Sequence, residues 1–228
     1  MLAREREELG PSARKQGLAV RAFFAVALQA ELREGAAACA RDLAARPGGD
    51  GVRWVAPSSY HLTLRFLGNV AGSAIARLAE RAEEALAGSV PFALTLGAPL
   101  AFPTSRRAKV IALAAQPANA LAELAARIEK AAVEQGLAPE ERAFRAHLTI
   151  GRVRARKFPA LDGIAPSGVQ TVRDVVLFRS DLTRDGAQYS PLATLALGAA
   201  TAASAHSPSQ QETQGAIHGE ERSSAAGR

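Results

Sequence analysis

The chain contains a single cysteine, Cys39, and aromatic residues make up only 5% of its 228 residues. One cysteine excludes an intrachain disulfide and a zinc site built from several thiolates. No apolar run in the sequence approaches the roughly 20 residues that a membrane-spanning helix requires. The N-terminal segment also lacks the apolar core of a signal peptide. We therefore expect a cytoplasmic protein with no membrane partner.

Hydrophobic residues make up 48% of the chain, and its formal net charge is +6, mostly from arginine. This length and composition suffice for one large domain or two lobes around a hydrophobic core. A basic surface favours polyanionic partners such as RNA, although net charge by itself identifies neither a fold nor a ligand.

The two ends of the chain differ in composition from its middle. Residues 1–17 carry mixed charge, and residues 199–228 are polar with almost no large apolar side chains. We expect an N-terminal extension, one domain over residues 18–198 and a disordered C-terminal tail. His206 and His218 belong to that tail, where we expect them to be solvated.

Between the ends, short apolar segments alternate with amphipathic ones, which predicts an α+β protein with two sheets or lobes. The expected helices cover residues 30–45, 73–87 and 118–135. The expected strands cover residues 20–28, 52–55, 60–67, 92–96, 109–114, 146–153, 169–178 and 189–197.

Two of these strands carry nearly the same tetrapeptide, His-Leu-Thr-Leu at 61–64 and His-Leu-Thr-Ile at 147–150. Side chains alternate between the faces of a strand, so His and Thr share one face and the aliphatic residues the other. The pair uses two of only four histidines. Either tetrapeptide alone fits an ordinary strand, but the repetition favours a functional site with one motif strand in each lobe.

Two imidazoles near pKa 6.5 can act together as acid and base at neutral pH. This suits in-line displacement at a phosphodiester, where threonine hydroxyls can bind the non-bridging oxygens. Neither tetrapeptide contains a carboxylate or a thiol. We therefore expect catalysis without a metal ion.

Arginines follow both motifs. Arg65 lies four residues after His61, so a regular strand places it beside the imidazole, although a solvated side chain fits equally well. Arg152 lies five after His147 and reaches the same face only if the strand is interrupted at Gly151. The cluster at 145–157 indicates either an RNA-backbone contact or ordinary solvated charge.

The doubled motif resembles that of the 2H phosphoesterases, and the chain is similar to their bacterial RNA 2′,3′-cyclic phosphodiesterases, also called 2′-5′ RNA ligases. Residues 18–197 carry the resemblance. Its parts are the segments 21–26, 52–68, 102–103 and 147–152 and the closing Ser180-Asp181-Leu182, Gly186 and Tyr189. Ala146 departs from the family, which commonly has proline before the second histidine.

This resemblance implies a bilobal fold of two antiparallel sheets with outer helices and a central cleft. His61 would donate a proton to the leaving 3′-oxygen, and His147 would accept one from water. Thr63, Thr149 and Arg152 would bind the phosphate. It implies no cofactor, a monomer, and as substrate RNA with 2′,3′-cyclic phosphate ends, tRNA fragments among them. Reversal would join RNA ends without ATP.

Two alternatives remain open at the level of sequence. The same fold could act on a different substrate, such as a 2′-5′ oligonucleotide or an ADP-ribose cyclic phosphate. A catalytically inactive protein that binds RNA phosphate ends is the other. Retention of both histidines and both threonines favours an enzyme, because binding alone does not require two imidazoles.

Overall fold

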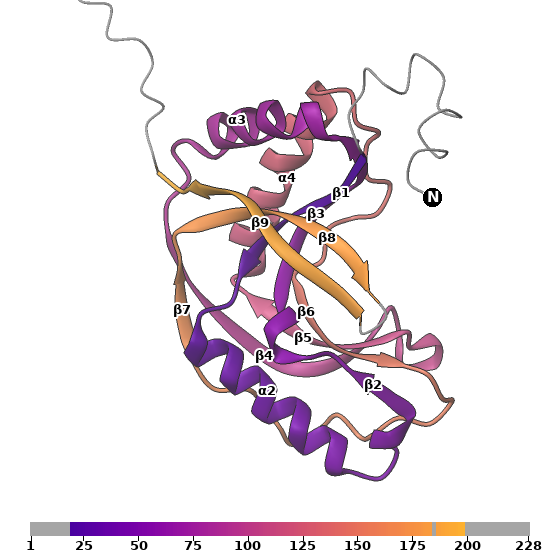
Figure 1. The fold of residues 1–228 in the computed structure, drawn as a ribbon. Coiled ribbons are helices and arrows are strands. Elements are labelled where there is room, and N and C mark those ends of the chain that lie inside the picture. Colours follow the sequence, from indigo (N-terminus) through magenta and orange to yellow (C-terminus); the bar gives the residue numbers. More distant parts are fainter. Residues whose placement is uncertain (1–18, 184–185, 199–228) are drawn as a thin grey trace, which may run out of the picture.

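The computed structural model describes residues 19–183 and 186–198 and shows an α+β fold with two antiparallel sheets (Figure 1). The predicted extension at 1–17 and tail at 199–228, with His206 and His218, lie outside the described residues. Among the described residues, no helix is both long and apolar enough to span a membrane.

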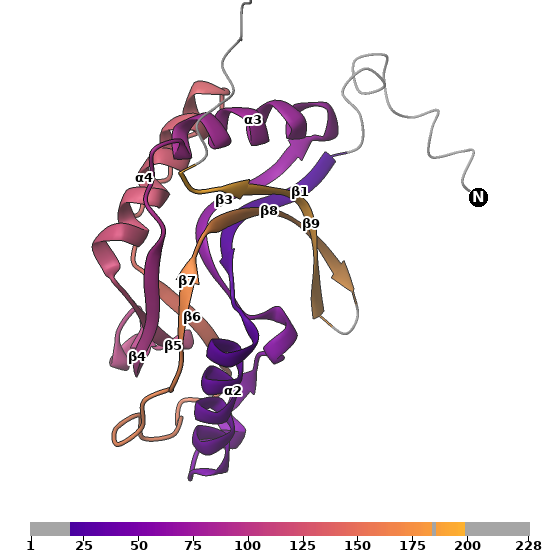
Figure 2. The same ribbon diagram turned by 90° about the vertical axis from the view of Figure 1, so that its left-hand side faces the viewer.

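The first sheet has four strands in the order β3-β1-β8-β9. Its members are β1 (Ala19–Ala27), β3 (His61–Ala71), β8 (Asp174–Thr183) and β9 (Gly186–Ala196). Figure 2 shows that this sheet curls strongly. Helices α3 (Ile75–Leu86) and α4 (Ala118–Glu134) pack together on its outer side, α4 against β3 and α3 against β9.

The second sheet has five strands in the order β2-β6-β5-β4-β7. They are β2 (Val52–Trp54), β4 (Phe92–Phe102), β5 (Val110–Gln116), β6 (His147–Val153) and β7 (Val169–Val172). Helix α2 (Ala30–Ala45) packs against β6 and β7. Four short 3-10 helices connect elements, at 49–51, 57–59, 72–74 and 105–107.

The chain passes repeatedly between the two sheets. It leaves β1 for α2 and β2 on the second sheet, returns to β3, and goes back to the second sheet through β4 and β5. One buried core includes side chains of both sheets and of all three helices, Phe24, Leu43, Leu86, Ile128 and Leu148 among them. The two lobes therefore share a core, and each contributes one motif strand, as the sequence predicted.

Three strand predictions need correction. Strand β3 continues through Gly68 to Ala71, because Gly68 adopts a positive φ of 71° within a strand that was expected to end there. Strand β4 extends to Phe102 rather than ending near residue 96. The single strand predicted at 169–178 is two strands separated at Arg173, β7 in the second sheet and β8 in the first.

Candidate active site

The two motif strands face one cleft of about 450 Å³ between the sheets. Leu62 and Leu64 of β3, like Leu148 and Ile150 of β6, are buried in the core. His61, Thr63, His147 and Thr149 all line the cleft. The alternation predicted from the sequence holds within both tetrapeptides, and it brings two imidazoles and two hydroxyls together.

Both histidines are held in the same way. The Nδ1 atom of His61 lies 2.8 Å from the carbonyl oxygen of Ser59, and Nδ1 of His147 lies 2.7 Å from that of Arg145. A carbonyl can only accept, so each Nδ1 carries the proton and donates it. The other nitrogen, Nε2, is left as the reactive atom of each ring.

His61 is surrounded by aromatic rings. Its centroid lies 4.8 Å from that of Phe23 and 4.9 Å from that of Tyr189, which contacts it edge-on at 82°. Burial lowers the pKa of His61 below its usual value of 6.5, and electrostatic interaction with Arg152 and His147 adds to this effect. The hydrogen bond to Ser59 opposes it without reversing it. The unliganded site therefore favours a neutral His61.

His147 stacks on a different ring. Its centroid lies 4.7 Å from that of Phe102, with the planes only 18° apart. The guanidinium carbon of Arg145 lies 4.3 Å from the centre of the same Phe102 ring. Phe102 ends β4, so the β4–β5 connection helps to orient the histidine of β6. The sequence marked Phe102 only through the family resemblance and indicated no contact with His147.

Both motif strands bulge immediately after the threonine. In the β1–β3 pairing, Ala25 opposes Thr63 while Phe24 opposes Arg65, which leaves Leu64 as the extra residue. In the β5–β6 pairing, Ala112 opposes Thr149 while Ile111 opposes Gly151, which leaves Ile150 extra. A bulge shifts the alternation by one residue. The fifth residue after each histidine therefore faces the cleft, and the fourth faces away.

For Arg152 the bulge confirms that the side chain reaches the cleft, as the sequence analysis required. The glycine before it permits close packing of β2. A Cβ on Gly151 would lie 2.6 Å from Cγ1 of Val52 and 3.2 Å from the Trp54 ring. Arg152 thus combines a cleft-facing position with a tightly packed strand pair.

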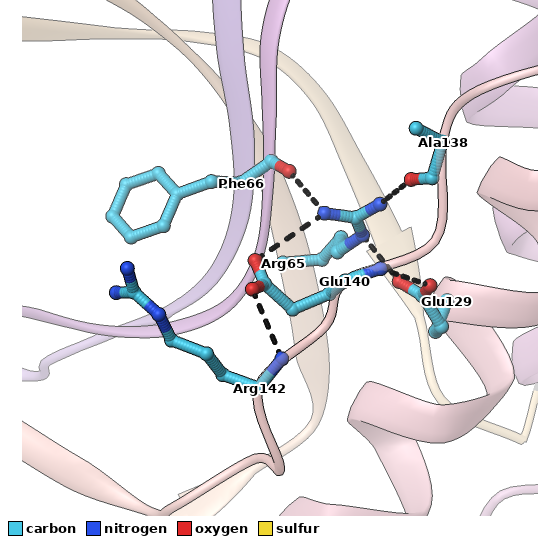
Figure 3. Close-up of polar contacts among 6 residues, drawn as sticks. All are labelled: Arg65, Phe66, Glu129, Ala138, Glu140 and Arg142. Atoms are coloured by element: carbon cyan, nitrogen blue, oxygen red, sulfur yellow. Dashed lines mark hydrogen bonds and ion pairs between the residues drawn. The ribbon is translucent and has the colours of Figure 1, made fainter.

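For Arg65 the same bulge makes the prediction wrong: the side chain points away from the cleft and is buried (Figure 3). It forms ion pairs with Glu129 of α4 and with Glu140, whose Oε2 lies 3.6 Å from Nη1. It also donates to the carbonyl oxygens of Phe66, at 2.8 Å, and Ala138, at 2.5 Å. The hydrogen bonds and ion pairs of Arg65 therefore tie β3 to α4 and to the loop before β6.

Phe66 occupies the cleft position that was expected for Arg65. Its side chain is 55% exposed, lines the cleft, and lies 5.7 Å from Phe23 between ring centroids. Arg21 of β1 also lines the cleft. The sequence analysis did not assign a site role to either residue, and the only available signal was their place in segments that resemble the family.

Among the described residues that line the cleft, none carries a carboxylate or a thiol. Within the described ranges, no group of three or more His, Cys, Asp or Glu residues is gathered as a metal site would require. The described lining offers two imidazoles for proton transfer, the two motif threonine hydroxyls as hydrogen-bond donors, and the guanidinium groups of Arg21 and Arg152 for an anion.

The fold and this cleft define a class: bilobal α+β proteins in which paired His-x-Thr strands face each other from two sheets. The family model of the 2′-5′ RNA ligase superfamily matches residues 44–183. The chain belongs to this superfamily.

Relatives and solved structures agree with this membership. The chain is 30% identical over 180 residues to the RNA 2′,3′-cyclic phosphodiesterase of Methanothermobacter thermautotrophicus, covering 76% of this chain and 96% of the relative. It is 32% identical over 179 residues to the Archaeoglobus fulgidus protein of the same name, covering 76% and 98%. The crystal structure of E. coli LigT in apo form superimposes with a TM-score of 0.66 at 29% identity, covering 79% and 99%.

Proposed function

We propose that this protein hydrolyses RNA 2′,3′-cyclic phosphodiester ends to 2′-phosphomonoesters. One observation carries the proposal: two histidines from different sheets line one cleft, and each presents Nε2 for proton transfer. The name shared by the M. thermautotrophicus and A. fulgidus relatives supports this substrate. The solved complexes of E. coli LigT with 3′-AMP and with phosphate support a nucleotide phosphate as the ligand of such a site.

In the proposed reaction, Nε2 of His147 takes a proton from water as its oxygen attacks phosphorus. The P–O3′ bond breaks, and Nε2 of His61 gives a proton to the leaving 3′-oxygen. The hydroxyls of Thr63 and Thr149 donate hydrogen bonds to the non-bridging oxygens, and Arg152 offsets their negative charge. The product carries the phosphate on the 2′-oxygen, and no metal ion takes part.

The lowered pKa of His61 reduces the fraction of the ring that is protonated and able to donate, and a substrate that raises this pKa restores that fraction. A phosphodiester anion beside the ring does so, because a nearby negative charge favours the protonated imidazole. Protonation of His61 is then coupled to binding of the substrate phosphate.

The same groups provide for ligation. With an RNA 5′-hydroxyl in place of water, His147 takes the proton from that hydroxyl, and a 2′-5′ phosphodiester forms as P–O3′ breaks. Microscopic reversibility lets His61 and His147 exchange roles in the opposite direction. No nucleotide activation is needed, because the strained cyclic phosphate is itself the reactive group.

The test is turnover of 2′,3′-cyclic AMP in the presence of EDTA. We expect His61→Ala and His147→Ala each to lower kcat by about a hundredfold or more, as is usual for a lost acid or base. His218→Ala, from the expected tail, is the matched control and should retain activity.

Four outcomes would count against the proposal. Full activity in either motif variant would exclude two-histidine catalysis, and loss of activity under EDTA would exclude the metal-independent mechanism. A 3′-phosphate product would require the opposite bond to break. Tight binding of RNA phosphate ends without any turnover would support the inactive binding protein instead.

A further inference from the structure

The charged side chains of the helices and those of the second sheet are arranged differently. On the helices, four cations are paired with acids of the same helix: Arg41 with Glu34, Arg81 with Glu84, Arg127 with Glu123 and Lys130 with Glu134. The five strands of the second sheet, in contrast, contain no Asp or Glu at all. Acidic residues are also missing from residues 142–161, the segment through β6.

Exposed cations gather where β2, β6 and the β4–β5 connection meet. We call this group the basic edge, and its members are Arg53, Lys109, Arg152, Arg154, Arg156 and Lys157. No ion pair is found for any of the six within the part of the chain that the structure describes. They therefore lack the ion-pair partners that the four paired helix cations have.

The basic edge is contiguous with the cleft. Arg53 and Arg152 are direct cross-strand partners, so their side chains share one face of the sheet. The backbone amide of Val153 donates a hydrogen bond to the carbonyl oxygen of Lys109 at 2.9 Å. That of Arg154 donates to the carbonyl oxygen of Gly51, also at 2.9 Å, so the end of β6 is bonded to the segments before β5 and before β2. Arg152 lines the cleft itself. The cations thus extend outward from the site of the scissile phosphate.

Like charges directly opposite each other in a sheet destabilise it. The guanidinium groups of Arg53 and Arg152 therefore repel each other, and an anion lying over the pair relieves that repulsion. A nucleic-acid backbone supplies one negative charge per nucleotide and is attracted by such a row of cations.

We propose that the basic edge binds the RNA strand that leads to the cyclic end, so that the enzyme acts preferentially on polynucleotides over mononucleotides. This inference rests on the proposed function. A 2′,3′-cyclic phosphate occupies the last nucleotide, so the only RNA outside the cleft is the portion on its 5′ side. That portion leaves the cleft past Arg152, with its phosphates over Arg53, Arg154 and Lys157.

The experiment compares two substrates, 2′,3′-cyclic AMP and a ten-nucleotide RNA with a 2′,3′-cyclic end, by kcat/KM between 50 and 200 mM salt. We expect wild-type protein to prefer the RNA, and the preference to fall as salt rises, because single-strand binding releases roughly 0.7 counterions per phosphate contact. The double variant Arg154→Glu with Lys157→Glu should lose the preference by about tenfold or more while retaining turnover of cyclic AMP.

The matched control reverses two charges elsewhere, Arg77→Glu with Lys130→Glu on α3 and α4, and should retain the preference. Equal loss in the control would assign the effect to net charge, and an unchanged preference in the edge variant would also overturn the proposal. A separate readout is fluorescence anisotropy of a 3′-phosphorylated ten-nucleotide RNA, which needs no turnover. If neither substrate is hydrolysed by wild-type protein, the proposed function fails, whereas anisotropy still tests the basic edge.

Discussion

Strands β3 and β6 begin with almost the same four residues and then use arginine in opposite ways. Both bulge at the residue after threonine, so in both the fourth residue beyond the histidine faces away and the fifth faces the cleft. In β3 the arginine is the fourth, Arg65, and in β6 it is the fifth, Arg152. This difference of one position places Arg65 in buried ion pairs, whereas Arg152 faces the cleft, where it can bind an anion.

The largest effect that would test this comparison is on stability. Arg65→Ala leaves Glu129 and Glu140 without their cation, and loss of one partner from a buried pair costs about 3 kcal/mol of unfolding free energy. We expect kcat of the folded variant to stay near wild type, since the Arg65 side chain does not line the cleft. Urea unfolding and cyclic-AMP turnover measure the two quantities.

Arg41→Ala is the matched control for Arg65, because it removes one member of an exposed ion pair with Glu34. Such pairs contribute roughly 0–1 kcal/mol. Equal destabilisation by the two variants, or a large loss of kcat in Arg65→Ala, would show that Arg65 is not the purely structural member of the comparison.

The reciprocal change is Arg152→Ala. In the proposed mechanism Arg152 stabilises charge at the reacting phosphate, so its removal is expected to lower kcat/KM on cyclic AMP by about a hundredfold, which is about 2.7 kcal/mol. Because the Arg152 side chain is exposed, we expect a change in unfolding free energy of no more than about 0.5 kcal/mol.

Phe66→Ala, at the equivalent position of β3, should lower kcat less than tenfold, because the ring carries no charge. Equal losses of kcat in Arg152→Ala and Phe66→Ala would show that the fifth positions of β3 and β6 do not differ in function.

The sequence predicted most of the fold because period-two strands and amphipathic helices are local patterns. It could not divide residues 169–178 into two strands, since the break at Arg173 reflects a change of sheet rather than a turn residue. The ends of β3 and β4 were also missed, because pairing with β1 and β5 continues across residues that resemble strand terminators.

Within the site, the sequence placed both histidines and both threonines correctly, because they precede the bulges. Beyond the bulges, the sequence could place a side chain correctly only where a residue such as glycine indicated the interruption of the strand. Gly151 indicated an interruption in β6, and Arg152 was placed correctly, whereas β3 has Arg65 at the equivalent position and gives no such indication. The register shift in β3 depends on pairing with β1, which is a tertiary contact that the local sequence does not encode.

The two histidines extend the comparison to protonation. Burial among Phe23 and Tyr189, with Arg152 and His147 nearby, lowers the pKa of His61 below 6.5. The protonated form of His61, which the proposed mechanism requires, is therefore the minor form of the free protein at neutral pH. Added inorganic phosphate should raise the pKa of His61, because its negative charge favours the imidazolium.

An NMR titration of the His61 ring, with its signals assigned by comparison with His61→Ala, measures the pKa of His61 without and with phosphate. The shift on adding phosphate should shrink in Arg152→Ala, which binds the anion less tightly. A His61 pKa at or above 6.5 in the free protein, or one that saturating phosphate does not change, would contradict the proposed coupling between substrate binding and protonation of His61. The difference between the two motif strands would then rest on the positions of Arg65 and Arg152 alone.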